Sequence, residues 1–128
     1  MRSKPVLQGL VALLALIPTS AGLAAIVLGP DFLRLDPPWP ADLDSHFRFL
    51  SGVFLAVGLG FYSCIPAIER KGPRFRLLAA LVFSGGLARL LSLAIAGTPS
   101  AGHVFGLGME LVAVPLLVLW QARLSLQA

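Results

Sequence analysis

The chain has 128 residues, a formal net charge of +4 and one cysteine, and 57% of its residues are hydrophobic. Only 12% of the residues are charged, against about 25% in a typical soluble domain. Residues 5–30, 49–68 and 77–122 together contain only two charged residues, Arg89 and Glu110. This composition excludes a soluble globular domain, a disordered chain and a disulfide framework, and it indicates an integral membrane protein.

The first apolar segment predicts a membrane-spanning helix near residues 6–28. A helix needs about 20 apolar residues to cross the hydrocarbon core of a bilayer, and this uncharged run exceeds that length. Pro18 is expected to kink the helix. The alternative is a cleaved signal peptide, because residues 1–4 are basic and residues 22–24 resemble a cleavage site. The apolar run continues beyond that site without a polar region, which favours retention as a span.

Three more spans are predicted from the remaining apolar segments. The run of residues 77–122 is too long for one helix, and the turn-forming residues 97–100 divide it. The further spans are then expected near residues 47–68, 77–96 and 102–120. We therefore expect an all-α, integral membrane four-helix bundle with up-down-up-down topology, forming a single transmembrane domain over residues 1–128.

The distribution of lysine and arginine predicts the orientation. Seven basic residues fall on one side of the predicted membrane, in the two terminal tails and in the loop of residues 69–76. They are Arg2, Lys4, Arg70, Lys71, Arg74, Arg76 and Arg123. The loop of residues 29–46 is instead acidic and rich in proline. The positive-inside rule therefore predicts cytoplasmic termini and a cytoplasmic 69–76 loop, with the 29–46 loop outside.

Arg89 and Glu110 are expected to pair, because a charge at the bilayer centre costs about 2.5–3.5 kcal/mol on insertion scales. Arg89 lies eight residues before Gly97, and Glu110 lies eight residues after Gly102. At 1.5 Å per residue, each side chain is about 12 Å from the outer end of its helix. Consecutive antiparallel helices are neighbours, so the two side chains are predicted to touch. His103 is expected one to two turns nearer the outer surface.

A second polar group begins the second predicted span. Asp44 and Arg48 have the i,i+4 spacing of a helical ion pair, and Asp44 or Ser45 suits the N-cap of the helix. We expect these residues to join the first pair in one buried polar cluster in the outer half of the bundle. The predicted cluster is Asp44, His46, Arg48, Arg89, His103 and Glu110.

Small residues are expected to let the helices approach one another closely and to leave room for a guanidinium or a ligand. The glycines assigned to helix packing are Gly52, Gly85, Gly86, Gly102 and Gly106.

Each of these features has a structural alternative. The Arg89–Glu110 pair would then only neutralise itself and fix the helix register, the Asp44–Arg48 pair would stabilise a helix start, and His103 would be a polar residue near a helix end. No catalytic residue, cofactor or metal site is expected, because no phosphate-binding loop, dinucleotide fingerprint, metal-type Cys/His spacing or G-x-S-x-G motif is present. The basic residues report orientation and contact with anionic lipid, so no nucleic-acid partner is expected.

Three stretches resemble a known family. They are residues 44–52 (DSHFRFLSG), residues 83–90 (FSGGLARL), and Glu110-Leu111 followed by Pro115. Together, in this order and spacing, they resemble an uncharacterised bacterial membrane family, domain of unknown function 4345. The resemblance implies a small four-helix inner-membrane protein with no established activity. The polar residues that match the family pattern are Asp44, Arg48, Arg89 and Glu110.

The leading hypothesis is a non-enzymatic membrane protein that binds an amphipathic ligand, lipid-like or quinone-like, or a membrane partner in the outer half of the bundle. The alternative is a membrane enzyme that transfers protons on a sterol- or quinone-type substrate, with Glu110 as acid or base, His103 as relay and Arg89 as charge stabiliser. A tight bidentate Arg89–Glu110 pair would disfavour this enzyme, whereas separated groups facing an open cavity would favour it. A third hypothesis is a small transporter, which would need to form a homo-oligomer. The sequence leaves the oligomeric state and the ligand open.

Overall fold

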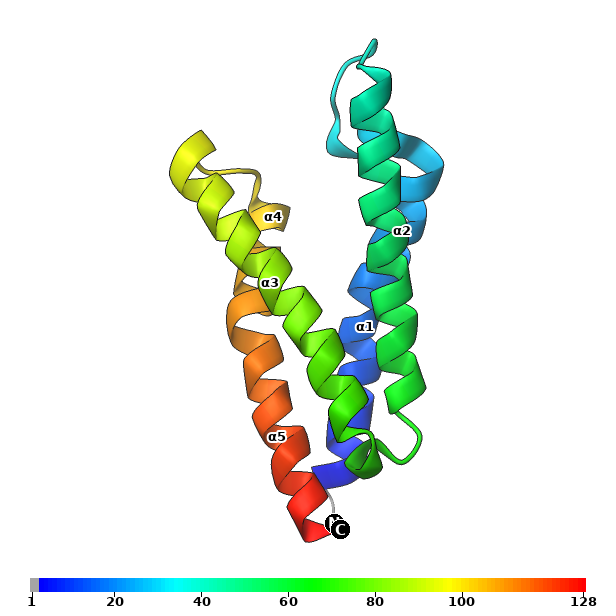
Figure 1. The fold of residues 1–128 in the computed structure, drawn as a ribbon, viewed down its shortest axis with the longest axis vertical. Helices are drawn as coiled ribbons and strands as arrows, with labels where there is room; N and C mark the ends of the chain where they lie inside the picture. The colour runs from blue at the N-terminus through cyan, green and yellow to red at the C-terminus, as the bar shows by residue number, and fades with distance from the viewer. Residues whose placement is uncertain (1–2) are drawn as a thin grey trace. The chain divides into compact units, whose positions relative to one another are not determined.

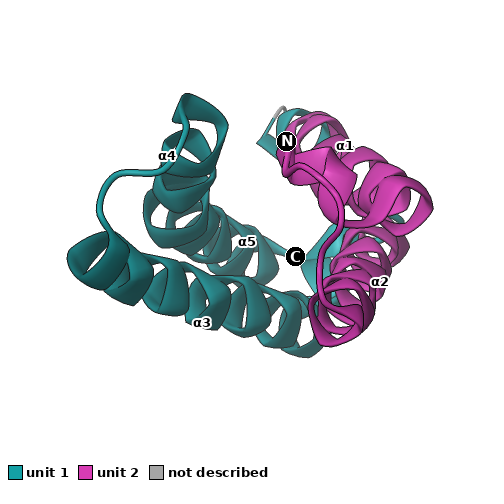
Figure 2. Ribbon diagram, turned by 90° about the horizontal axis from the view of Figure 1, so that it is seen from above, with its two compact units in different colours: residues 1–7, 66–128 teal, residues 8–65 magenta. Residues whose placement is uncertain are grey.

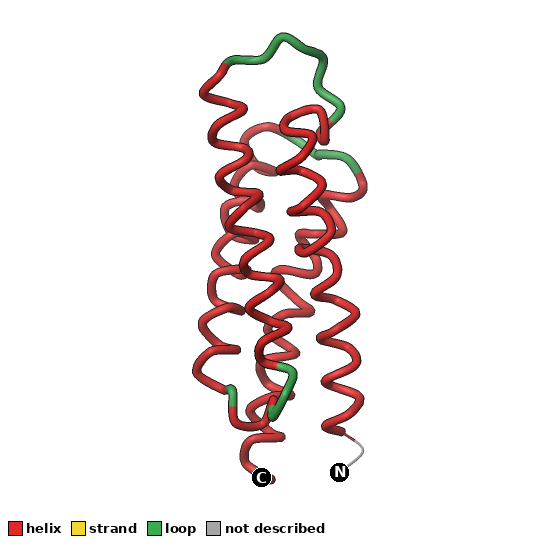
Figure 3. The backbone as a smooth tube through the Cα atoms, turned by 90° about the vertical axis from the view of Figure 1, so that its right-hand side faces the viewer, coloured by secondary structure: helices red, strands yellow, loops and turns green. Residues whose placement is uncertain are grey.

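The computed structural model describes residues 3–128, and over this range the chain forms helices joined by short loops (Figures 1 and 3). No strand occurs in the described residues, which confirms the predicted all-α class. The elements are α1 (Ser3–Leu28), η1 (Gly29–Leu33), α2 (Ala41–Cys64), η2 (Ile68–Arg70), α3 (Gly72–Ala96), α4 (Ala101–Gly108), η3 (Met109–Ala113) and α5 (Val114–Gln127). Arg2, one of the basic residues used to predict orientation, lies outside the described residues.

Within residues 3–128, four helical stretches are long and apolar enough to cross a membrane. Their mean hydropathies are 2.3, 1.5, 1.9 and 1.8 in chain order, and they cover Ser3–Leu33, Ala41–Cys64, Gly72–Ala96 and Ala101–Gln127. Large apolar side chains remain exposed along them, for example Val27 at 69% and Ile95 at 77%. Such a surface suits a hydrocarbon environment. The prediction of four helices with the length and hydropathy of membrane spans is confirmed.

The second span differs from its predicted bounds. It begins at Ala41 rather than near residue 47, and it ends at Cys64 rather than near residue 68. The prediction that Asp44 or Ser45 forms the N-cap is wrong, because Pro40 occupies that position in an extended conformation. The backbone N–H of Asp44 donates to the Pro40 carbonyl at 3.2 Å, which places Asp44 inside the helix. The helix therefore starts in a charged segment that hydropathy alone does not assign to it.

The third span also starts earlier than predicted, at Gly72 rather than near residue 77. Pro73 lies in its first turn, where a fixed φ and a missing N–H favour helix initiation. The basic residues Arg74 and Arg76 consequently lie on α3 and not in the preceding loop.

The chain divides into two compact units, residues 1–7 with 66–128 and residues 8–65 (Figure 2). In the second of these, α1 and α2 are antiparallel. A Cβ atom added to Gly22 would lie 2.8 Å from the backbone nitrogen of Leu55, and the Tyr62 hydroxyl donates to the Ala12 carbonyl at 2.8 Å. Glycine thus brings the two backbones together in this unit.

The other unit pairs α3 with α5 and η3 in an antiparallel arrangement (Figure 1). Phe75, Ile68 and Gln121 are fully buried in it. Gly72 approaches Gln121 at one end, and Gly86 approaches Glu110 further along α3. This pair therefore carries two buried polar side chains, Glu110 and Gln121, whereas Ser51 is the buried polar side chain of α2.

Candidate functional site

The fourth span is interrupted at Glu110 by a turn of π-helix, η3. The Val114 N–H donates to the Met109 carbonyl, five residues earlier. Pro115 follows directly and has no N–H, and in a regular α-helix its ring would clash with the carbonyl of residue 111. The wider turn accommodates the proline, and such turns recur at functional sites. The sequence analysis missed this feature, and Pro115 was the signal that could have indicated it.

The predicted contact between Arg89 and Glu110 is confirmed. The Arg89 Nε donates to Glu110 Oε2 at 3.1 Å, and Nη2 donates to Oε1 at 3.0 Å. The pair is therefore bidentate, the geometry in which guanidinium and carboxylate match best. The Glu110 side chain is only 10% exposed, whereas that of Arg89 is 33% exposed. The carboxylate is thus held inside the helix pair, and the guanidinium reaches the surface.

His103 completes this network from α4. The Arg89 Nη1 lies 2.9 Å from His103 Nδ1. A guanidinium can only donate hydrogen bonds, so Nδ1 accepts and the ring proton must reside on Nε2. Within residues 3–128 the ring has no other hydrogen-bond partner. The network is then neutral overall, and it has an unused N–H donor on His103.

The close approach of α3 and η3 depends on Gly86. A Cβ atom added there would lie 2.8 Å from Glu110 Cβ and 2.9 Å from Leu111 Cδ2. At Gly106 the added atom would make an ordinary contact, 3.7 Å from Glu110 Oε1. The other three predicted packing glycines leave open space within 4 Å of an added Cβ, namely Gly52, Gly85 and Gly102. Their assignment to close packing is therefore corrected, because no backbone or side chain of the described chain approaches them.

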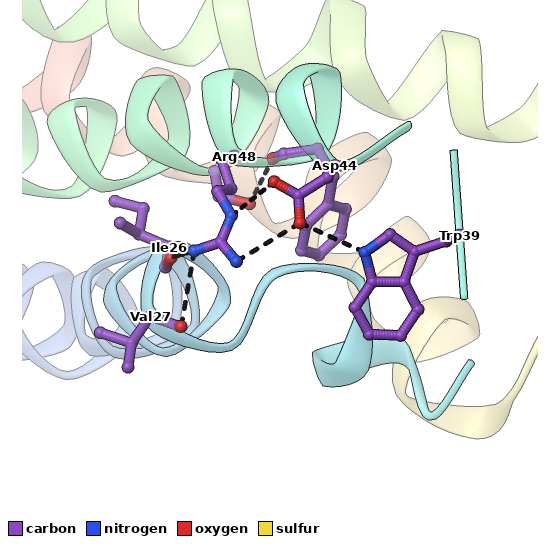
Figure 4. A network of polar contacts seen from close by, with 7 residues as sticks. Ile26, Val27, Trp39, Asp44 and Arg48 are labelled. Carbon is purple, nitrogen blue, oxygen red and sulfur yellow. Dashed lines mark hydrogen bonds and ion pairs between the residues drawn. The ribbon is translucent and has the colours of Figure 1, made fainter. Parts of the chain in front are cut away.

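Asp44 and Arg48 form a second network, which also includes Trp39 (Figure 4). The Arg48 Nε donates to Asp44 Oδ1 at 2.8 Å, and Nη2 lies 3.4 Å from Oδ2. The Trp39 indole N–H donates to the same Oδ2 at 3.2 Å. Both charged side chains are partly exposed, Arg48 at 41% and Asp44 at 32%.

The Nη1 group of Arg48 caps the C-terminus of α1. The Arg48 Nη1 donates to the carbonyls of Ile26 and Val27 (Figure 4), which belong to the last turn, where helix carbonyls lack intrahelical partners. Gly29 follows with φ +64°, and an added Cβ there would lie 2.5 Å from Arg48 Nη2. The guanidinium therefore occupies the space above a glycine in the left-handed conformation typical of helix ends. Arg48 has a structural task that the sequence analysis did not predict.

Each unit contains one polar network, and the expectation that the two networks join in one cluster stays a prediction. Arg89, His103 and Glu110 belong to one, and Asp44 and Arg48 to the other. The prediction that these residues are buried holds for Glu110 alone, because the others keep part of their polar groups at the surface. Over the described range, no three His, Cys, Asp or Glu residues gather closely enough to hold a metal ion.

The part of the chain that the structure describes contains four apolar helices of spanning length, which define its class as a multi-pass α-helical membrane protein. Residues 6–121 match the family described as Domain of unknown function (DUF4345). The chain therefore belongs to this family, as the resemblance implied. No curated protein and no solved structure matches it significantly.

Proposed function

We propose that this chain is a non-enzymatic membrane protein that binds an amphipathic molecule through a carbonyl oxygen at the exposed edge of Arg89 and His103. The observation that supports it best is the 2.9 Å contact between Arg89 Nη1 and His103 Nδ1, because a ring that accepts at Nδ1 carries its proton on Nε2, which has no partner within residues 3–128. Arg89 uses three of the five N–H groups of a guanidinium in the network, so two remain for a ligand. Hydrogen-bond donors that lack an acceptor on an apolar helix favour the binding of a molecule that supplies an acceptor.

The charge balance favours a carbonyl over an anion. Glu110 already neutralises Arg89 through a bidentate pair. Arg48, the arginine of the other network, is engaged by Asp44 and by helix carbonyls. A quinone ring or a lipid ester offers a neutral acceptor attached to a hydrocarbon tail. Val104 and Phe105 beside His103 are 43% and 56% exposed and offer apolar surface to such a tail.

The proposal also concerns the position of the site in the membrane. We place the site in the outer half of a bacterial inner membrane, with both termini in the cytoplasm. The support is the grouping of basic residues in the 69–76 segment and the tails, which follows the positive-inside rule.

The enzyme hypothesis is less well supported than binding. A proton-transfer role needs a Glu110 oxygen that can approach a substrate, yet both oxygens are engaged by Arg89. The carboxylate is also the most buried group of the network. This is the tight bidentate arrangement expected to disfavour the enzyme.

The test is native mass spectrometry of the full chain released from lipid nanodiscs, with a decyl-substituted benzoquinone as probe and decylbenzene as its carbonyl-free counterpart. We expect the quinone to bind and decylbenzene not to bind. His103→Phe keeps a ring and removes the donor, so quinone affinity should fall about tenfold, the value of one or two hydrogen bonds. His46→Phe is the matched control, because His46 is exposed and belongs to neither network.

A double replacement separates binding from a purely structural role. Arg89→Leu with Glu110→Leu removes the charge pair without leaving a single buried charge. If this variant folds and still retains the quinone, the pair is structural and the proposed function fails. Equal quinone affinity in His103→Phe and His46→Phe would contradict it as well. The same spectra report how many copies of the chain assemble, which tests the possible homo-oligomer.

A further inference from the structure

An open groove of about 450 Å³ lies between α3 and α5, at the end of α3 away from Arg89. Ala80 and Phe83 line it from α3, and Pro115 and Val118 line it from α5. Its surface is almost entirely apolar, and its volume lies in the range of small-molecule sites, about 300–1,000 Å³. All its lining residues belong to one unit.

One charged residue, Arg76, stands at the end of this groove. Its side chain is exposed, and within residues 3–128 it forms no ion pair. A Cβ atom added to Gly72 would lie 2.8 Å from Arg76 Nη1 and 3.6 Å from the amide of Gln121, so both side chains approach the same point. The Gln121 Oε1 is buried there without a hydrogen-bond partner. The groove thus has a polar, cationic end.

The groove runs along the helices from this cationic end into the apolar span. Phe83 lies seven residues after Arg76, a rise of about 10 Å along α3. Arg70 and Lys71 precede α3 in the same basic segment, which the positive-inside rule assigns to the cytoplasmic side, where the leaflet contains anionic lipids. A charge at the interface followed by an apolar channel matches a lipid headgroup followed by an acyl chain.

We propose that this groove binds one anionic phospholipid, with the headgroup phosphate on Arg76 and an acyl chain along α3 and α5. A zwitterionic lipid would also bring a phosphate, but its ammonium group would offset that charge and weaken the attraction to Arg76. A second copy of the chain would bury that arginine unpaired, which is costly. The site is distinct from the carbonyl site, since Arg89 lies 13 residues further along α3, about 20 Å away.

The headgroup arm of the test uses matched arginine variants. The detergent-purified full chain is mixed with phosphatidylglycerol or phosphatidylcholine, and retained lipid is counted by native mass spectrometry. We expect phosphatidylglycerol to bind more tightly than phosphatidylcholine, and Arg76→Gln to weaken it about fivefold, the value of one basic contact. Arg70→Gln removes the same charge outside the groove and should leave the affinity within twofold. Inorganic phosphate should not displace the lipid, because it has no chain to occupy the groove.

The chain arm uses matched alanine variants. Ala80→Leu fills the groove and should lower the retention of both lipids, whereas Ala88→Leu, on an exposed part of α3 beyond the groove, should not. Phosphatidylglycerol with a photoactivatable acyl chain should crosslink to peptides that contain Phe83 or Val118 in the unmodified protein, which does not depend on how the variants fold.

Three results would overturn the proposal. Equal loss of lipid in Arg76→Gln and Arg70→Gln would show that the lipid responds to the overall surface charge and not to the groove. A dimer that Ala80→Leu dissociates would assign the groove to a second copy of the chain. Crosslinks spread over all four spans would show that no groove is preferred.

Discussion

Each of the two polar networks of this protein pairs an arginine with a carboxylate, but the two pairs lie in different settings. Asp44 and Arg48 lie four residues apart on one helix, whereas Arg89 and Glu110 lie 21 residues apart and join two helices. In the first network the Nη1 group of the arginine reaches backbone carbonyls at the end of α1. In the second, the remaining donors reach a histidine ring and the surface.

The role of each arginine therefore depends on the group that it contacts besides its carboxylate, which is a pair of backbone carbonyls for Arg48 and the His103 ring for Arg89. Backbone carbonyls are fixed acceptors, so Arg48 is committed to holding a helix end. A histidine ring can accept on one nitrogen and donate on the other. Because Arg89 donates to Nδ1 of His103, the Nε2–H of His103 remains available as a donor. An arginine–carboxylate pair thus holds a helix end in one unit, and in the other it supports the hydrogen-bond donors of the proposed ligand site.

The largest expected difference between the networks follows from removing the carboxylate. Glu110→Leu leaves Arg89 without its counter-charge between two helices, and we expect a loss of about 3 kcal/mol in the free energy of unfolding. Asp44→Leu should cost about 1 kcal/mol, because Arg48 keeps its carbonyl partners. Both values are measurable by SDS titration of the purified protein in detergent.

A double-mutant cycle tests whether the first loss comes from the pair. Adding Arg89→Leu to Glu110→Leu should restore most of the stability, giving a coupling energy well above 0.5 kcal/mol. Additive losses would mean that the cost arises from packing, and the contrast between the networks would disappear.

The second prediction concerns the close approach of α3 and η3 at Gly86, on which the Arg89 network depends. Gly86→Ala would place a methyl group 2.8 Å from Glu110 Cβ, and we expect destabilisation of about 2 kcal/mol, typical of overpacking. Gly85→Ala is the matched control, because an added Cβ meets nothing within 4 Å. It should stabilise α3 by about 0.5–1 kcal/mol. Thermal unfolding of the two variants side by side measures the difference, and similar midpoints would contradict the close approach.

The third prediction tests the capping role of Arg48. Arg48→Gln removes the charge from the last turn of α1 and should cost about 1–2 kcal/mol. The loss should be local, so amide hydrogen exchange should accelerate in residues 26–33 and stay unchanged around Glu110. Arg48→Lys should recover part of the stability, since it keeps the charge but not the planar fork. Accelerated exchange throughout the chain would argue against a local cap.

The spans and the Arg89–Glu110 contact could be predicted from the sequence because each depends on one large energy term, the transfer of apolar residues into the bilayer and the cost of an unpaired charge there. Long uncharged runs favour spans, and the cost of an unpaired charge in a bilayer requires a partner at similar depth. The helix starts could not be predicted in this way. Hydropathy assigns Asp44 and Arg76 to loops, although local pairing in the first case and Pro73 in the second extend the helices over them.

The task of Arg48 lay beyond sequence reasoning for a different reason. Its acceptors are backbone carbonyls of residues 26 and 27, and every residue has a carbonyl, so no side-chain pattern identifies them. The close approach at Gly22 was missed because many glycines occur in this chain, and only the register of α1 against α2 selects this one. Both the acceptors of Arg48 and the close glycine contact depend on the three-dimensional register of the helices, which composition does not give.

The smallest effect is expected at a third ion pair, Lys4–Glu69, which belongs to neither network and joins α1 to η2 at 3.0 Å. The Glu69 carboxylate accepts a hydrogen bond from its own backbone N–H and pairs with Lys4, and these contacts lower its pKa below the ordinary value of 4.5. A lowered pKa stabilises the folded state above that value, and the contribution is lost as the pH falls through the folded-state pKa. The difference in unfolding midpoint between the unmodified protein and Glu69→Gln should therefore be constant from pH 7 to 5 and vanish in stronger acid. Lys4→Met should give a smaller difference with the same pH dependence, because the backbone hydrogen bond remains; a difference that grows in acid would contradict the assignment.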